Sequence, residues 1–321
     1  MLLVGSIALL VVAAVVVRET NATRSLVQSL RQGDDSARRE AANNLSDVSV
    51  VDLKMAVPAL AEALKGDPNV EVRSEAARTL GTLGAEAIRL RDQPSRDQAR
   101  DALTSAILDK ESKVREVALS MIPVLALAAT NISNNEYDLA LVGNPGSVVM
   151  KILPALADPV EIVRSTAANA LGYFPVQLDP SLPMLLKAAV AEAPSSNPRA
   201  RGIMAGLFRK VRPLKSSMPF LLESIGSTDP KVRFYAITAL GQMSTDAVDA
   251  VPALIKIAKD PAGADEPEDP GRAAATALGA IAPGTPKADE ARTALQEAQA
   301  SAPESRNRAI AAALRDLETA P

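Results

Sequence analysis

Residues 67–81 read DPNVEVRSEAARTLG and residues 158–172 read DPVEIVRSTAANALG, so two distant segments share one pattern at one spacing. After the arginine, apolar residues recur every three or four positions, which places them on one stripe of an α-helix. The Asp-Pro pair suits a helix start, because Asp can cap the first turn and Pro lacks an N–H that would have no partner there. The stripe is narrow and made of small residues, so we expect it to be buried only against a neighbouring helix.

The same pattern returns along most of the chain. A third copy reads DPKVRFYAITALG at residues 229–241, and a looser copy covers residues 109–122. A second helical segment with an early proline precedes these copies, for example residues 57–64 before the copy at 67–81 and residues 218–222 before the copy at 229–241. The unit is therefore helix, turn, helix, with a period of roughly 35 to 45 residues. We predict an all-α fold, an α-solenoid of about eight helix pairs preceded by one hydrophobic helix.

The recurring set of a proline in the first helix, Asp-Pro, Val-Arg, Ala-Ala and Leu-Gly resembles HEAT repeats, particularly the short repeats of phycobilin-lyase-like proteins. The resemblance covers about residues 25–318. It implies that the recurring acidic and basic residues form an inter-repeat ladder of charge-assisted hydrogen bonds: Asp67, Arg73, Asp109, Arg115, Asp158, Arg164, Asp229 and Arg233. A ladder is a structural feature, because an active site needs one constellation of residues. The seventh unit departs from the pattern, with Gly271 in the place of the arginine.

The N-terminal stretch predicts a membrane anchor. Leu2–Val17 carries no charge, and the first charged side chain is Arg18. As a helix the stretch would be roughly 25 Å long, close to the shortest that crosses a bilayer core. A cleaved signal peptide and a buried core helix are the alternatives, but the basic residues of the first and the polar stripe of the second are missing. We expect residues 1–18 to form the anchor and residues 19–321 the solenoid.

The charges around this stretch predict its orientation. Three arginines follow the apolar run and none precedes it, so the positive-inside rule favours a single-pass protein with the solenoid on the cytoplasmic side.

The composition excludes several classes of protein. The chain has 321 residues, a net charge of −3 and no His, Cys or Trp. It therefore contains no zinc finger, no Cys-ligated cluster, no His-ligated haem and no Ser-His-Asp or Cys-His nucleophile. The sequence also shows no phosphate-binding glycine loop or nucleophile elbow. We expect a protein that is not an enzyme, without catalytic, cofactor-binding or metal-binding residues and without a cofactor.

A basic cluster is the candidate partner-binding site. Residues 193–222 contain no Asp or Glu, although the protein as a whole is acidic. The cluster could attract an acidic protein, anionic lipids or nucleic acid, or it could be a solvated helix face. Nucleic acid is disfavoured by the low pI, near 5.3, and by the 2% aromatic content. The candidate residues are Arg199, Arg209, Lys210, Arg212 and Lys215.

Together these patterns predict a monomeric, membrane-tethered scaffold or adaptor without catalysis, whose solenoid surface binds a protein partner. The alternative is a lyase-type or enzyme-accessory HEAT protein that acts on a bound cofactor or a modified partner protein.

Overall fold

A computed structural model describes residues 2–133, 142–192, 198–261 and 266–319, with the side chains of residues 2–16, 50, 133, 192 and 198–201 left outside the description. Within that part of the chain every regular element is a helix. The chain divides into two compact units, Met1–Tyr173 and Phe174–Pro321. Each unit is a row of helix pairs, as the sequence predicts.

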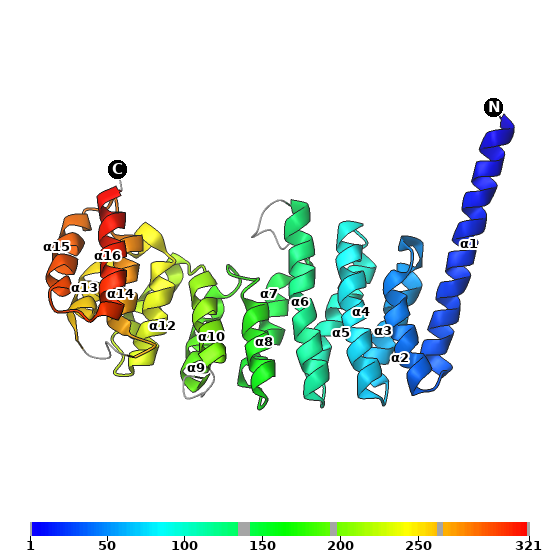
Figure 1. Cartoon of the computed structure of the whole chain (residues 1–321), viewed down its shortest axis with the longest axis horizontal. Coiled ribbons are helices and arrows are strands. Elements are labelled where there is room, and N and C mark those ends of the chain that lie inside the picture. Colours follow the sequence, from blue (N-terminus) through cyan, green and yellow to red (C-terminus); the bar gives the residue numbers. More distant parts are fainter. Residues whose placement is uncertain (1, 134–141, 193–197, 262–265, 320–321) are drawn as a thin grey trace. The chain divides into compact units, whose positions relative to one another are not determined.

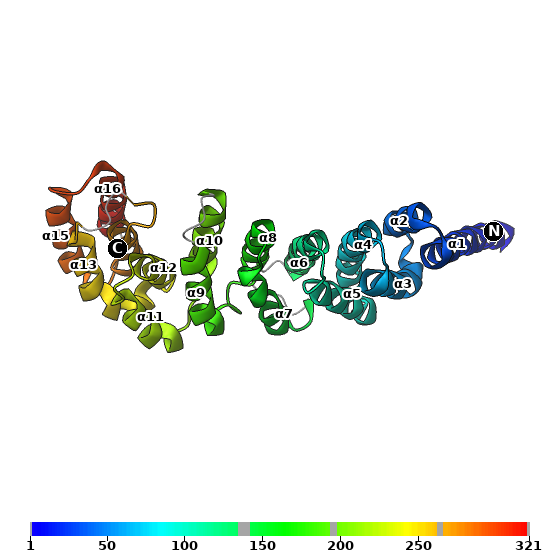
Figure 2. The same cartoon turned by 90° about the horizontal axis from the view of Figure 1, so that it is seen from below.

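Unit 1 holds four helix pairs in two layers (Figure 1). In Figure 2, α3, α5 and α7 lie in one layer and α2, α4, α6 and α8 in the other. The helices are α1 (Leu2–Gln32), α2 (Asp35–Asn44), α3 (Leu53–Gly66), α4 (Val70–Arg89), α5 (Gln93–Ala106), α6 (Ser112–Ser133), α7 (Pro145–Ile152) with the 3₁₀ turn η4 (Leu153–Ala157), and α8 (Glu161–Leu171). Each second helix packs on the second helices before and after it, as α4 does on α2 and α6.

Unit 2 holds four more pairs. They are formed by α9 (Leu182–Glu192), α10 (Pro198–Lys210), α11 (Met218–Ile225), α12 (Pro230–Gly241), α13 (Val251–Lys259), α14 (Pro270–Ile281), α15 (Ala288–Gln299) and α16 (Glu304–Thr319). The second helices α10, α12, α14 and α16 again pack in succession. The described part of the chain therefore contains eight helix pairs, and the predicted all-α solenoid is confirmed.

The apolar N-terminal stretch differs from the prediction in one respect: it is not a separate helix. α1 runs without a break from Leu2 to Gln32, and its second half is the first helix of the first pair. Val27 and Leu30 are buried there, and the Thr23 hydroxyl lies 2.9 Å from a carboxylate oxygen of the buried Asp52. The predicted boundary at residues 18–19 falls inside this helix. The side chains of residues 2–16 are outside the description, so the anchor itself stays a prediction.

Where side chains are described, one helical stretch is long and apolar enough to cross a membrane, Ser112–Ile132 of α6. Half of its most apolar window is buried inside the unit, where α6 packs on α4, α5 and α8. Burial of this kind is typical of a core helix in a stacked array.

The recurring arginines and aspartates of unit 1 form a continuous network. Arg73 donates from Nε and Nη2 to the carboxylate of Asp109, 36 residues later, at 2.8 and 3.0 Å, while its Nη1 donates to the backbone carbonyl of Asp67 at 2.9 Å. Arg115 repeats both contacts, with Asp158 and with the Asp109 carbonyl. Each arginine therefore joins its own repeat to the next. We call each such Arg–Asp contact a rung of the ladder.

The network begins one repeat before the predicted set. Arg38 donates to the Asp67 carboxylate at 2.7 Å, so the first rung begins one repeat before the predicted residues. Arg164 donates to the carbonyl of Asp158 at 2.8 Å. Each aspartate also accepts a hydrogen bond from the backbone N–H two residues on, in the turn before the following helix.

These contacts change the pKa of the buried carboxylates. Burial alone raises the pKa of Asp109, but the hydrogen bonds from Arg73 and from the Glu111 N–H, with the positive charge of Arg73, hold it below the ordinary value. The pKa of Asp158 is lowered in the same way by Arg115 and the Val160 N–H. Folding therefore favours the charged form of both groups.

Asp229 and Arg233 take a different arrangement. Asp229 stands four residues before its arginine, whereas Asp67, Asp109 and Asp158 each stand six before theirs. Arg233 still donates to the carbonyl six residues back, that of Ser227, at 2.8 Å. The shortened spacing moves the Asp229 carboxylate to the helix start, where it accepts from the Lys231 N–H at 2.8 Å. Asp229 is a helix cap, and it forms no ion pair with a residue that the structure describes.

The Leu-Gly element of the repeat permits close helix packing in some units. A Cβ atom built on Gly279 of α14 would lie 2.8 Å from the Cα and 2.9 Å from the Cβ of Ala313 in α16. At Gly241 of α12, the corresponding Cβ would lie 3.5 Å from the Cα of Ala277, an ordinary contact. α16 therefore approaches α14 too closely for any side chain at position 279.

Breaking one rung should destabilise unit 1. Arg73→Ala leaves the Asp109 carboxylate, whose side chain is 12% exposed, without its cation, so we expect the free energy of unfolding to fall by about 3 kcal/mol at neutral pH. Glu62→Ala removes the exposed Arg31–Glu62 pair and should cost less than about 1 kcal/mol. Urea unfolding followed by circular dichroism measures both free energies of unfolding. Equal losses in the two variants would show that the buried Arg73–Asp109 contact stabilises the unit no more than an exposed ion pair does.

The same rung predicts a pH dependence. Because the pKa of Asp109 is lowered on folding, its stabilising contribution is complete above the unfolded value near about 4 and is lost as the pH falls through the folded value. Asp109→Asn should therefore be less stable than wild type at neutral pH and lose less stability between about pH 5 and pH 2.

Gly279→Ala should destabilise unit 2 by about 1–3 kcal/mol, because its methyl group has no space against the Ala313 backbone. The matched control is Gly241→Ala at the same repeat position, which should be neutral or slightly stabilising. Thermal melts of the two variants compare them directly. If both variants melt like wild type, the close α14–α16 contact is not required.

Candidate functional site

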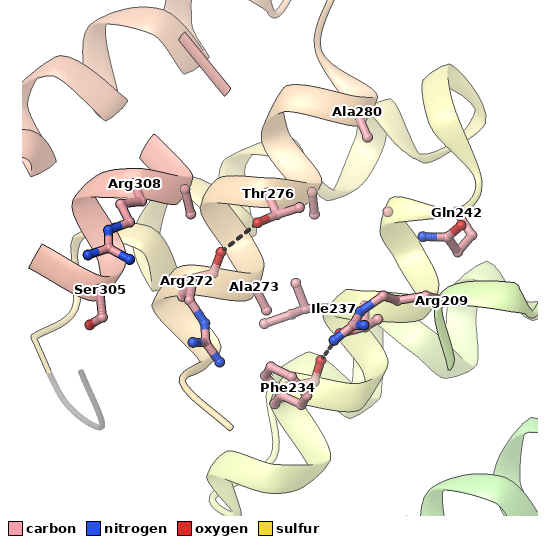
Figure 3. A pocket seen from close by; sticks show the side chains of 14 residues that line it. Arg209, Phe234, Ile237, Gln242, Arg272, Ala273, Thr276, Ala280, Ser305 and Arg308 are labelled. Atoms are coloured by element: carbon pink, nitrogen blue, oxygen red, sulfur yellow. Dashed lines mark hydrogen bonds between the residues drawn. The ribbon is translucent and has the colours of Figure 1, made fainter. Parts of the chain in front are cut away.

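The candidate site is a groove of about 500 Å³ on the face of unit 2 formed by the second helices (Figure 3). We call it the arginine groove. Residues of α10, α12, α14 and α16 line it: Arg209, Phe234, Ile237, Thr238, Gly241, Gln242, Arg272, Ala273, Thr276, Ala277, Ala280, Ser305, Arg308 and Ala309. Its volume is in the range of sites for small ligands or a few residues of a peptide.

Three arginines supply all the formal charge of the lining. Arg209 comes from α10, Arg272 from α14 and Arg308 from α16, and the lining contains no Asp or Glu. Figure 3 shows Arg209 beside Ile237 at one end of the groove and Arg308 at the other, with Arg272 between them. The electrostatic potential of the groove is therefore positive, in a chain whose net charge is −3.

The rest of the lining is small or uncharged. Ile237 and Ala277 are buried, whereas Ala280 and Thr276 of α14 are exposed. The Thr276 hydroxyl donates to the carbonyl of Arg272 at 3.1 Å, and that of Thr238 donates to the Phe234 carbonyl at 2.8 Å. Between the arginines, the surface of the groove is therefore formed by small apolar side chains and threonine hydroxyl groups.

Two of the arginines, Arg272 and Arg308, occupy the same position in successive repeats. Arg272 and Arg308 each follow the position where the repeat pattern has its ladder arginine, which Gly271 and Asn307 occupy in these two units. Phe234 holds the same place in α12, after Arg233. Equivalent positions of successive stacked helices face the same side, so the three side chains line one groove.

One Arg–Asp contact of the ladder runs in the opposite direction beside the groove and holds α16 on α14. We call this contact, between Arg306 and Asp269, the exchanged rung. Arg306 donates from Nε and Nη2 to the Asp269 carboxylate at 3.0 and 2.7 Å, and from Nη1 to the Asp260 carbonyl. Both side chains are almost fully buried, at 3% and 1% exposure. In unit 1 an arginine reaches forward to the aspartate of the next repeat. Here the last repeat reaches back, and its guanidinium fills the space beside Gly271.

The glycine explains why the seventh unit departs from the repeat. A Cβ atom on Gly271 would lie 2.3 Å from the Cζ of Arg306. No residue with a side chain fits there while Arg306 binds Asp269. The exchange fixes the first turn of α16, and with it Arg308, next to Arg272.

The described side chains of the predicted basic cluster lie in different surroundings. Only Arg209 lines the arginine groove, and it forms no ion pair with a described residue. Arg212 donates to Gln242 Oε1 at 3.0 Å, and Lys215 pairs with Asp246 at 2.9 Å. Lys210 is exposed outside the lining, and the side chain of Arg199 is outside the described residues.

Sequence reasoning missed Arg272 and Arg308 as site residues. They are 36 positions apart, and each is surrounded by small or mixed residues. The available signal was their shared repeat position, directly after the place of the ladder arginine. A search for charges that recur at one repeat position would have paired them.

The described residues offer no metal site, since no group of three or more acidic side chains is placed to hold an ion. The predicted absence of catalytic and cofactor-binding residues stays a prediction.

The chain belongs to the HEAT-repeat family. The family model for HEAT repeats matches residues 23–122, 186–266 and 218–315, which is more than half of the chain. The comparison with curated proteins finds no match.

One solved structure shares the fold, and an engineered protein matches with a lower score. A structure of Kap95p binding to RanGDP is 16% identical, with a TM-score of 0.58, and the match covers 92% of this chain and 40% of that one. An engineered protein is 20% identical with a TM-score of 0.48, over 92% of this chain and 78% of that one. Identities this low show the fold alone.

The exchanged rung yields a prediction. Gly271→Ala should displace the Arg306 guanidinium and leave the buried Asp269 unpaired, lowering the free energy of unfolding by more than about 2 kcal/mol. Arg306→Ala should cost a similar amount. The double variant should cost much less than the sum, because both changes break one interaction.

Gly206→Ala is the control for the cost of the methyl group. Gly206 lies in α10, and a Cβ there meets no atom within 4 Å. That variant should melt at or slightly above the wild-type temperature. Additive losses for Gly271→Ala and Arg306→Ala would show that the two residues do not depend on each other.

Proposed function

We propose that this protein is a non-catalytic scaffold that binds a partner protein in the arginine groove and is tethered to a membrane by Leu2–Val17. Membership of the HEAT-repeat family supports the binding role, because HEAT-repeat proteins generally bind other proteins. Kap95p, which shares the fold, binds RanGDP.

One observation carries the choice of surface. Four successive second helices of unit 2 line a groove that contains three arginines and no carboxylate. Charges on stable surfaces are normally interspersed in sign, because like charges repel one another. A groove of one sign is therefore better explained by a partner that neutralises it than by the stability of the fold.

The tether is supported by the uncharged run and by the continuity of α1. The helix that begins in the predicted anchor continues into the first repeat without a linker. Figure 1 shows the first half of α1 extending beyond the ends of α2 and α3. A membrane-embedded first half would thus fix the position of the first repeat, and would raise the effective concentration of the scaffold for membrane-bound partners.

The positive-inside rule favours the solenoid on the cytoplasmic side, with Arg18, Arg24 and Arg31 after the run. The absence of histidine and cysteine from the sequence supports a role without catalysis and without a cofactor.

A photocrosslinking experiment in native membranes tests this function. The full chain carries a photoreactive residue in place of Thr276, which is exposed in the groove, or in place of Thr293, which is exposed on the first helix α15 of the last pair. We expect a discrete protein adduct from position 276 and none from position 293. We also expect the chain to stay in the membrane pellet after alkaline extraction.

The outcomes separate the parts of the proposal. Adducts of equal yield from both positions, or none, would remove the groove as the binding surface. Recovery in the alkaline supernatant would remove the tether. A pigment or cofactor that co-purifies stoichiometrically would favour the lyase-type or accessory function instead.

A further inference from the structure

The hydrogen-bonding groups that line the arginine groove are mostly donors. Arg209 has no ion-pair partner among the described residues, and Arg308 pairs with Glu304 only at the surface, where both side chains are about four-fifths exposed. Such exposed pairs contribute little and exchange readily for another carboxylate. Arg272 uses one guanidinium nitrogen on the Pro267 carbonyl, which leaves its other N–H groups available.

Among the neutral polar groups, the Gln242 amide also offers donors, whereas the two threonine hydroxyls offer only acceptor lone pairs. Gln242 accepts a hydrogen bond from Arg212 at Oε1, so its amide nitrogen keeps both protons for a ligand. The hydroxyl protons of Thr238 and Thr276 are already donated to backbone carbonyls of their own helices. A ligand that fits this lining therefore supplies acceptors, and anionic ones, because the three guanidinium groups favour negative charge.

The arrangement of the arginines distinguishes a chain from a single anion. Arg209 and Arg308 lie at opposite ends of the groove, across α12 and α14 (Figure 3). One phosphate or carboxylate cannot bind both. Two or more anionic groups joined by a short spacer can, and the spacer would lie over the exposed small residues Thr276 and Ala280.

We propose that the arginine groove binds an acidic segment of the partner protein, in which two carboxylate side chains flank a small or apolar residue. One carboxylate binds Arg209 and the other binds Arg272 and Arg308, since guanidinium groups bind carboxylates in a planar, two-point geometry. This inference rests on the proposed function, because it names the chemistry of the partner at the same site.

The charge of the protein as a whole makes this recognition selective. The chain carries 38 acidic and 35 basic residues, so most of its surface does not attract an acidic segment. The groove concentrates positive charge at one place, which both steers an acidic segment to it and sets its position. Single-stranded nucleic acid also carries repeated anions, but it is bound mainly by stacking on exposed aromatic rings, and the one ring in the lining, that of Phe234, is only 7% exposed.

Fluorescence anisotropy with the full chain in detergent tests the inference. The probe is a labelled ten-residue peptide in which Glu and Leu alternate, and the matched probe has Gln in place of every Glu. We expect the Glu peptide to bind and the Gln peptide to bind at least ten-fold more weakly. The affinity for the Glu peptide should fall as salt is raised, because the pairing is electrostatic.

Variants assign the binding to the groove. Arg209→Gln and Arg272→Gln should each weaken the Glu peptide about five- to ten-fold, and the double variant should abolish measurable binding. The control is Arg315→Gln, because Arg315 is an exposed arginine of α16 that does not line the groove. Its affinity should be that of wild type. Unchanged melting temperatures of the variants would show that lost binding is not lost folding, and Arg308→Gln replaces any variant that melts early.

Three results would overturn the inference: equal affinity for the Glu and Gln peptides, wild-type affinity in the double variant, or preferential binding of a single-stranded RNA of equal charge that the same variants abolish. These results leave the scaffold function standing if the Thr276 crosslink to a partner forms. Loss of that crosslink with selective Glu-peptide binding intact would instead remove the proposed partner and keep the chemistry of the groove.

Discussion

A helix pair made of Ala, Val and Leu cannot bury its own apolar stripe, and the rest of this structure depends on that constraint. Within a unit, a second helix is covered by its own first helix and by the second helices next to it, as α4 is by α3, α2 and α6. The stripe can be narrow because the layers are thin, which is why a chain with 2% aromatic residues still forms a core in each unit. Every other feature therefore depends on the stacking of the repeats. The groove is an example, because residues of four successive repeats line it.

Stacking alone does not fix how one pair sits on the next, and the buried Arg–Asp contacts supply that. An arginine bound at once to the carbonyl of its own repeat and to the carboxylate of the next accepts only one relative position of the two pairs. The same aspartate also accepts a hydrogen bond from the backbone N–H of Glu111, directly before the next helix. Because a displaced partner would leave a buried charge unpaired, neighbouring repeats slide little.

The periodic features of the fold could be predicted from the sequence, and the features that depend on an exact offset could not. The helix pairs follow from a stripe that recurs with the same residue types. Asp229 looks like a ladder residue, but the two-residue shortening before Arg233 makes it a helix cap. A related effect acts in the basic cluster. Residues 193–222 contain no acid, yet Asp246 of the next repeat neutralises Lys215. In a stacked array the neighbours of a charge lie one period away, so counting charges along the chain misjudges its surroundings.

The arginine groove occurs where the repeat pattern is broken, and the break has a structural cause. Gly271 removes a ladder arginine from the seventh unit, and Arg306 of the last unit fills the vacated space. The same exchange sets the first turn of α16 against the first turn of α14, which carries Arg272, and Arg308 follows in the second turn of α16. The charge buried in the rung is neutralised by Asp269, whereas the two arginines beside it have no carboxylate in the groove lining. This departure gives up the regular ladder and lines one groove with three arginines and no carboxylate, which is the structural basis of the binding role proposed above.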